Sequence, residues 1–168
     1  MKTASLAFVI TCLAAFVSMP AFAASTDKEQ PIEVEADSLE IRENDNISIY
    51  SGNVRLVQGS LNARSDKLVI HFDDDKNLVL MEMTGAPASF RQLDDENREM
   101  IGQADKLDYY EPKSLLELKG NARFSNDRDL IEGSTISINT DNNNLQAASP
   151  EADKRVRVVI QPKGKKQE

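Results

Sequence analysis

Apolar and polar residues alternate along most of the chain after Ala23. A period of two is typical of β-strands with one buried face, and no later stretch has the spacing of an amphipathic helix. Asn and Asp clusters at 44–46, 73–77 and 141–144 separate the runs and predict turns. The alternating positions are Ile32, Val34 and Ala36; Ile47 and Ile49; Leu68, Ile70 and Phe72; Leu107 and Tyr109; Ile136 and Ile138; and Val156, Val158 and Ile160. The pattern predicts an all-β fold of many short strands.

The chain also contains an internal repeat, whose matching segments keep a constant offset in the numbering. Residues 36–39 (Ala-Asp-Ser-Leu) match residues 104–107 (Ala-Asp-Lys-Leu), and residues 52–56 (Gly-Asn-Val-Arg-Leu) match residues 120–124 (Gly-Asn-Ala-Arg-Phe). Each half looks subdivided again, since residues 66–68 echo residues 37–39, and residues 85–90 echo the Gly-Asn segments. The unit is a pair of short strands that cannot bury its apolar face alone, so stacked units should share one continuous core.

The phase of the alternation changes within the predicted strands. Residues with even numbers are predicted to face inward through Ala36, and residues with odd numbers after it. Odd-numbered residues are also predicted inward at Ile47 and Ile49, and even-numbered ones after them. These changes fall at Asp37, Gly52 and Asp66, and matching changes fall at Asp105 and Gly120. A side-chain period of two cannot skip a residue without a bulge or bend. Each long strand should therefore be two short strands joined at a corner. Corners in register fold the meander into two facing sheets, a jelly roll or flattened coil.

Residues 1–23 predict a cleaved signal peptide. Lys2 gives a positive start, an apolar run extends from Leu6 to Met19, and Ala21-Phe22-Ala23 provides a small-x-small cleavage site. This run is shorter than the roughly 20 residues of a membrane span. Cys12, the only cysteine, leaves with the signal, so an exported chain would be held without disulfides. We expect one domain over residues 24–162 and a basic disordered tail over residues 163–168.

The charge argues against nucleic acid as a partner. The formal net charge is −8, and loss of Lys2 with the signal makes it −9. Such a surface repels nucleic acid and anionic head groups at long range, so an anionic amphiphile would be held chiefly by its apolar part. Basic residues gather after residue 153, which could orient neighbouring molecules head to tail.

Catalytic chemistry is scarce in this sequence. His71 is the only histidine and alternates with apolar neighbours, so it should point outward from a strand. Residues 73–75 (Asp-Asp-Asp) lack the ligand spacing of a calcium loop and predict a solvated turn. Asp37, Asp66 and Asp105 recur at corners and should be structural. We therefore expect no enzyme activity, catalytic residue, metal site or cofactor. The inward positions form either a closed core or a groove for an apolar ligand.

The ordered set of motifs resembles the OstA-like family of periplasmic lipopolysaccharide transport proteins. The segments are 30–37 (Gln-Pro-Ile-Glu-Val-Glu-Ala-Asp), 50–54 (Tyr-Ser-Gly-Asn-Val), 63–68 (Ala-Arg-Ser-Asp-Lys-Leu), 85–90 (Gly-Ala-Pro-Ala-Ser-Phe), 118–122 (Leu-Lys-Gly-Asn-Ala) and 154–156 (Lys-Arg-Val). The resemblance implies an open, twisted β jelly roll that binds lipid A acyl chains. It also implies head-to-tail association into a periplasmic bridge that carries lipopolysaccharide from the inner to the outer membrane, with LptC at the N-terminal edge and the periplasmic domain of LptD at the C-terminal edge.

By motif match, the resemblance places Ile32 and Val34 at the lipid entry and Phe90 and Tyr109 in the groove. Four further positions are inward by phase alone, and they are either lipid-binding or plain core: Leu68, Ile70, Leu118 and Phe124. Two terminal segments look usable as pairing edges, with residues Ile32, Val34 and Ala36 on one and Val156, Val158 and Ile160 on the other.

Two alternatives stay open at this point: a periplasmic scaffold that binds no lipid, and a soluble shuttle that encloses one lipid without forming a bridge. The sequence departs from the family at Phe72, where a basic residue is common before the turn at 73–77. This departure leaves a lipid phosphate contact at that turn without support.

Overall fold

The computed structural model describes residues 27–94, 96–127, 129–150 and 155–161. The signal peptide predicted at 1–23 and the tail predicted at 163–168 lie outside the described residues. The described elements are η1 Asp27–Glu29, β1 Glu33–Glu35, β2 Ser38–Arg42, η2 Glu43–Asp45, β3 Ile47–Gln58, β4 Leu61–Phe72, β5 Leu78–Leu93, β6 Glu99–Tyr110, η3 Glu111–Lys113, β7 Leu115–Asn126, β8 Asp129–Asn139, β9 Asn144–Ala148 and β10 Arg157–Val159.

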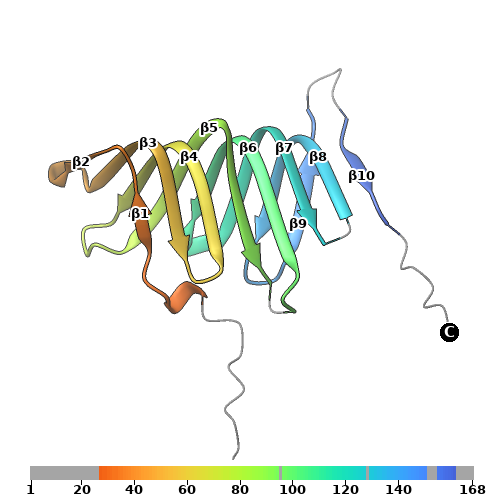
Figure 1. The fold of residues 1–168 in the computed structure, drawn as a ribbon, viewed down its shortest axis with the longest axis horizontal. Coiled ribbons are helices and arrows are strands. Elements are labelled where there is room, and N and C mark those ends of the chain that lie inside the picture. The colour runs from red at the N-terminus through yellow and green to blue at the C-terminus, as the bar shows by residue number, and fades with distance from the viewer. Residues whose placement is uncertain (1–26, 95, 128, 151–154, 162–168) are drawn as a thin grey trace, which may run out of the picture.

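The strands form one 10-stranded antiparallel sheet in which β3 to β8 follow one another as a meander. Each of these long strands bends near its middle, so the sheet folds into two facing halves (Figure 1). One half ends in β1 and β10, and the other half ends in β2 and β9. This is the open, twisted β jelly roll expected above, and the prediction of the fold class is confirmed.

The bends lie in one row across the sheet, as the recurring Gly and Asp residues predicted. Register shifts occur between Ser51 and Val54 in β3, and they recur at the matching places in β4 to β8. Gly52 and Gly120 have positive φ values of 82° and 77°, and a Cβ at either position would overlap the carboxylate of Asp37 or Asp105, respectively. Only glycine combines this backbone with such close approach.

The same corner is built twice, once in each copy of the repeat. The Asn53 Nδ2 donates to Asp37 Oδ2 at 2.8 Å, and the Asn121 Nδ2 donates to Asp105 Oδ2 at 2.9 Å. The same offset relates Ile47–Gln58 of β3 to Leu115–Asn126 of β7. The aspartates at these corners are therefore structural hydrogen-bond acceptors, as expected, and the repeat is a property of the fold.

The predicted inward phase of Ile47 and Ile49 is wrong. These residues pair with His71 and Val69 in outward rows, whereas Tyr50 pairs with the buried Leu68. At the bend, β4 leaves one residue unpaired, and its inward phase changes from odd to even residue numbers. β3 leaves one more residue unpaired at the same corner, as a bulge, so its inward phase does not change. The inward positions of β3 therefore stay even on both sides of Gly52, and those of β7 stay even across Gly120. The predicted phase changes at Asp66 and Asp105 are confirmed, since Ser65 and Leu68, and likewise Ala104 and Leu107, are buried.

Candidate functional site

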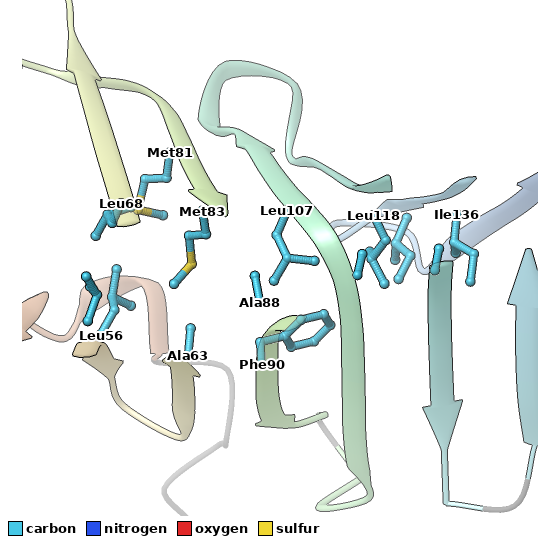
Figure 2. Packing of buried hydrophobic residues seen from close by; sticks show 14 of the residues in the cluster. Leu56, Ala63, Leu68, Met81, Met83, Ala88, Phe90, Leu107, Leu118 and Ile136 are labelled. Atoms are coloured by element: carbon cyan, nitrogen blue, oxygen red, sulfur yellow. The ribbon is translucent and has the colours of Figure 1, made fainter. Parts of the chain in front are cut away.

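The inner faces of the two halves enclose the apolar interior. In one half, a row of paired residues crosses the whole sheet: Leu39, Tyr50, Leu68, Met83, Leu107, Leu118, Ile136 and Ala147. In the other half, the corresponding row is Val34, Leu56, Ala63, Phe90, Gly102, Phe124, Ile131 and Val158. Side chains of the two rows face each other across the space between the halves (Figure 2). The interior is therefore a continuous apolar strip that reaches both ends of the sheet.

The interior is tightly packed beside the bends and hollow toward the opposite side, where the hairpin turns lie. A cavity of about 110 Å³ opens among Met81, Met83, Phe90, Tyr109 and Leu116, with mostly apolar walls. Two further hollows adjoin it along the turn side, and they share Phe90 and Tyr109, respectively, with the first. We call this set of hollows the groove and its turn side the mouth.

The turn η1 lies at the mouth and contacts both halves. The Asp27 carboxylate accepts hydrogen bonds from the backbone N–H and hydroxyl of Ser60, at 2.8 and 2.5 Å, and from Gln92 at 3.0 Å. The Lys28 Nζ lies 2.8 Å from Asp141 Oδ1 and 3.3 Å from Ser114 Oγ on the other half. The side chains of η1 thus span the mouth.

The electrostatics of η1 follow from these contacts. The hydrogen bond to Asp141 raises the pKa of Lys28, and the same bond lowers the pKa of Asp141. Burial alone would raise the pKa of Asp27, but the hydrogen bonds from Ser60 and Gln92 outweigh it and lower the pKa. All three groups are therefore charged at neutral pH.

The predicted lipid-binding residues separate into two groups. Phe90 and Tyr109 line the groove, Phe124 lines the hollow beside Phe90, and Ile32 lines the hollow beside Tyr109. Leu68, Ile70 and Leu118 are buried in the packed cluster, and Val34 is half-buried against it. The structure therefore brings Ile32 and the three aromatic residues to the hollows and places the other four in the packed part of the interior. The role of all eight in binding stays a prediction.

The predicted edges lie at opposite ends of the sheet. Val34 is in β1 and Val158 is in β10, whereas Ile32, Ala36, Val156 and Ile160 flank these strands. Within the described residues, no strand pairs with the outer side of β1 or of β10. Val158 and Ile160 expose 51% and 71% of their surface, which leaves apolar side chains beside unpaired backbone.

The sequence reasoning missed a second pair of edges and several groove residues. Strands β2 and β9 end the other half, and Leu39 and Ile41 of β2 are exposed by 52% and 61% although they continue inward rows. Met81 and Met83 line the groove, and their alternation within residues 78–83 (Leu-Val-Leu-Met-Glu-Met) could have identified them. The alternation of apolar and polar residues could not have identified Lys28, because it lies in a short charged turn.

The outer face carries a network of charged side chains. His71 points outward as expected, with its Nε2 2.8 Å from Glu82 Oε2. Lys106 contacts Glu82 at 2.5 Å and the buried Asp108 at 3.2 Å. Among the described residues, no group of three or more His, Cys, Asp or Glu side chains is placed to hold a metal ion, and no helix is both long and apolar enough to cross a bilayer.

Comparison with known proteins identifies relatives of this chain. The family described as "LptA/(LptD N-terminal domain) LPS transport protein" matches residues 33–144. The lipopolysaccharide export system protein LptA of Escherichia coli (strain K12) is 30% identical over 159 residues, which cover 94% of this chain and 85% of the relative. The export system protein LptH of Pseudomonas aeruginosa is 27% identical over 173 residues, which cover 99% of this chain and 98% of LptH.

A solved structure agrees with these relatives. The crystal structure of LptH, described as the LptA homologous periplasmic component of the conserved lipopolysaccharide transport device from Pseudomonas aeruginosa, matches with a TM-score of 0.74 and 25% identity. The match covers 82% of this chain and 99% of the LptH chain. Sequence and fold therefore point to the same family.

Proposed function

This chain belongs to the LptA/(LptD N-terminal domain) family of lipopolysaccharide transport proteins, and from this premise we propose that it is a periplasmic, non-enzymatic section of the bridge that carries lipopolysaccharide from the inner to the outer membrane. The acyl chains of lipid A occupy the groove. Copies of the chain join head to tail, LptC meets the N-terminal edge, and the periplasmic domain of LptD meets the C-terminal edge. The observation that carries the proposal is an apolar interior that runs from one unpaired end of the sheet to the other.

The energetics of an acyl chain favour a continuous conduit. Each methylene moved out of water contributes about 0.8 kcal/mol, so a chain of about a dozen carbons amounts to roughly 10 kcal/mol as an upper bound. If the conduit had an aqueous gap, the acyl chain would be exposed to water again at each crossing, which would cost most of that free energy. Apolar rows that reach both ends of the sheet allow neighbouring molecules to extend one interior.

The cavity of about 110 Å³ is small beside a lipid with several acyl chains, so binding requires the halves to move apart at the mouth. Met81 and Met83 suit this change because methionine has flexible, polarisable side chains that repack at low cost. The packed cluster beside the bends, with Leu68 and Leu118 fully buried, then acts as the hinge side of the groove.

The sheet itself suggests how two copies join. Following the paired residues from β1 through β3–β8 to β10 brings Val34 into one row with Val158, and Glu35 into one row with Arg157. If the next molecule continues these rows, its β1 lies antiparallel to β10 of the first. Val158 then faces Val34 in the interior, and Arg157 faces Glu35 on the outer face.

The second half gives the same register. The rows of β2 and β9 align Leu39 with Ala147 and Ile41 with Leu145. The repeat supports this register independently, because Val34 and Leu39 correspond to Gly102 and Leu107 of β6, which pair with Phe90 and Met83 of β5. The junction between molecules therefore copies the contact between β5 and β6 within one molecule.

Site-specific photo-crosslinking in intact cells tests lipid binding. A photoreactive residue at Phe90 should yield a lipopolysaccharide adduct, and one at Ser89, the adjacent residue in an outward row, should not. A scaffold that binds no lipid gives no adduct at Phe90, and adducts of equal yield at both positions indicate non-specific contact. Either result overturns the lipid-binding proposal.

Blocking the edges separates a bridge from a shuttle. Val34→Pro and Val158→Pro each remove a backbone donor from a terminal strand. Both variants should abolish head-to-tail assembly, seen by analytical ultracentrifugation, and lipopolysaccharide export with it. Normal export without assembly assigns the chain to the shuttle class.

A further inference from the structure

The turn η1 is fastened to one half of the sheet by a close backbone contact. Asp27 packs against Gly59, whose φ is +56°, and a Cβ on Gly59 would overlap the Asp27 carboxylate. Gln58 adds hydrogen bonds from its Nε2 to the carbonyl oxygens of Lys28 and Gln30, at 3.3 and 3.1 Å. With these bonds and those from Ser60, the backbone of η1 has a fixed position at the mouth, and Lys28 extends from it.

Lys28 is the one basic residue among the described residues that line the three hollows of the groove, and it lines all three. Its ammonium therefore stands between the apolar interior and solvent, in a chain whose net charge is −8. The acyl chains of an amphiphile in the groove would leave its head group at this mouth. The position of Lys28 fits the negative charge of such a head group.

The other charged residues that line the three hollows are acidic. Asp27 is held by Ser60 and Gln92, Asp94 accepts a charged hydrogen bond from Arg98 at 2.8 Å, and Glu111 lines the hollow beside Tyr109. These carboxylates repel an anion from most of the rim. Lys28 is therefore the point at which a head-group anion is attracted.

The present partner of Lys28 is easily replaced. The side chains of Lys28 and Asp141 are 54% and 63% exposed, and an ion pair this exposed stabilises little. A phosphate offers more negative charge and more acceptor oxygens than a carboxylate, and acyl chains in the groove would hold it in place. Exchange of partners at Lys28 is thus favourable once lipid is bound.

We propose that Lys28 is an anion-binding residue at the mouth of the groove, where it leaves Asp141 and binds a phosphate on the head group of an acylated lipid whose chains occupy the interior. This inference rests on the proposed function. It gives Lys28 and Asp141 opposite roles: Lys28 attracts the phosphate, and Asp141 competes for the same ammonium. A purely structural clasp across the mouth would give the two residues the same role.

The test is equilibrium binding of labelled lipid A to the full chain after removal of the signal. Lys28→Met should weaken binding of phosphorylated lipid A by about three- to tenfold and leave binding of the phosphatase-treated lipid unchanged. Lys28→Arg should retain binding, and Asp141→Asn should strengthen it. Lys67→Met and Asp45→Asn, which make the same charge changes at exposed positions away from the three hollows, should have no effect.

Several results would overturn this inference alone. One is that Lys28→Met weakens binding of the phosphorylated and the phosphatase-treated lipid A equally, and another is that it weakens binding of neither. A third is that Lys28→Met and Asp141→Asn both weaken binding. Inorganic phosphate should show no measurable binding, and its binding through Lys28 would assign the site to the free anion instead. If the unaltered chain binds neither form of lipid A, the proposed function itself fails, so the two failures are distinguishable.

Discussion

The register proposed for the head-to-tail junction makes a quantitative prediction about Glu35 and Arg157. A single junction can be isolated by mixing two blocked chains: one carries Val34→Pro and offers only its C-terminal edge, and the other carries Val158→Pro and offers only its N-terminal edge. Arg157→Gln is then introduced in the first chain and Glu35→Gln in the second, singly and together. The four dissociation constants form a double-mutant cycle that isolates the pairwise interaction.

The expected coupling follows from the surroundings of the pair. The Glu35 and Arg157 side chains are 77% and 66% exposed, and they already contact Arg55 at 3.7 Å and Glu132 at 2.8 Å in their own molecules. Exposed ion pairs contribute about 0.2–1 kcal/mol, and a pair within an alternating row of charges belongs in the upper part of that range. We therefore expect a coupling of about 0.5–1 kcal/mol, a factor of roughly two to five in the dissociation constant.

Analytical ultracentrifugation or calorimetry of the mixed chains measures this coupling. Effects of each substitution on its own molecule, such as loss of the Glu132 contact, cancel in the cycle. A junction that forms with no coupling between Arg157 and Glu35 contradicts the register. Coupling of Arg157 to Glu33 instead would show that the strands slide along each other to the next outward position, which the aligned corners should prevent.

Three further predictions concern stability and the groove. Glu82→Gln should lower the free energy of unfolding by about 1 kcal/mol at pH 7. The hydrogen bond from Lys106 lowers the pKa of Glu82 from its ordinary value, so this contribution is present above the unfolded pKa and is lost as the pH falls through the folded pKa. The stabilities of the two proteins in urea denaturation should therefore converge in acid. Gly102→Ala should lower the free energy of unfolding by about 1–3 kcal/mol and weaken lipid binding, because the added Cβ would overlap the Phe90 ring and push it into the groove. The melting temperature and the lipid affinity of the variant measure the two effects. Asn121→Ala should lower the free energy of unfolding by about 1–2 kcal/mol, because it removes the hydrogen bond to Asp105 and places alanine in a left-handed backbone with φ of 49°. Asn121→Gly should lower it less, since glycine adopts this backbone readily. Equal losses of stability in urea denaturation would contradict the backbone part of this account.

The corners were predictable from the sequence because each depends on a short local motif. A glycine with positive φ followed by asparagine, facing an aspartate, leaves a signal in residue type, and the internal repeat shows it twice. The inward phase of Ile47 and Ile49 was predicted wrongly because a bulge residue cancels the skipped residue of the bend. Alternation alone cannot reveal that cancellation, since it depends on the pairing of β3 with β4.

The groove was only partly predictable for a different physical reason. Leu118 and Phe90 are both inward and both belong to the buried cluster, but only Phe90 lines the cavity. The phase of the alternation shows which face of the strand a residue occupies and does not show whether a cavity lies beside it. Lys28 was missed because its place depends on the hydrogen bonds from Ser60 to the neighbouring Asp27 and on its own contact with Asp141, both far away in sequence.

Charge at the two ends of the sheet should favour the proposed head-to-tail junction over the other ways in which an open sheet can join. An unpaired edge accepts any compatible strand, and apolar side chains beside it make unwanted pairing worse. The edge strand β1 carries Glu33 and Glu35, whereas β10 begins with Arg157 and is preceded by Arg155. Two N-terminal edges would bring glutamates together, and two C-terminal edges would bring arginines together, so both like pairings are repulsive. The proposed head-to-tail junction places Glu35 opposite Arg157 and continues the apolar rows, so the same few residues would disfavour the wrong junctions and stabilise the right one.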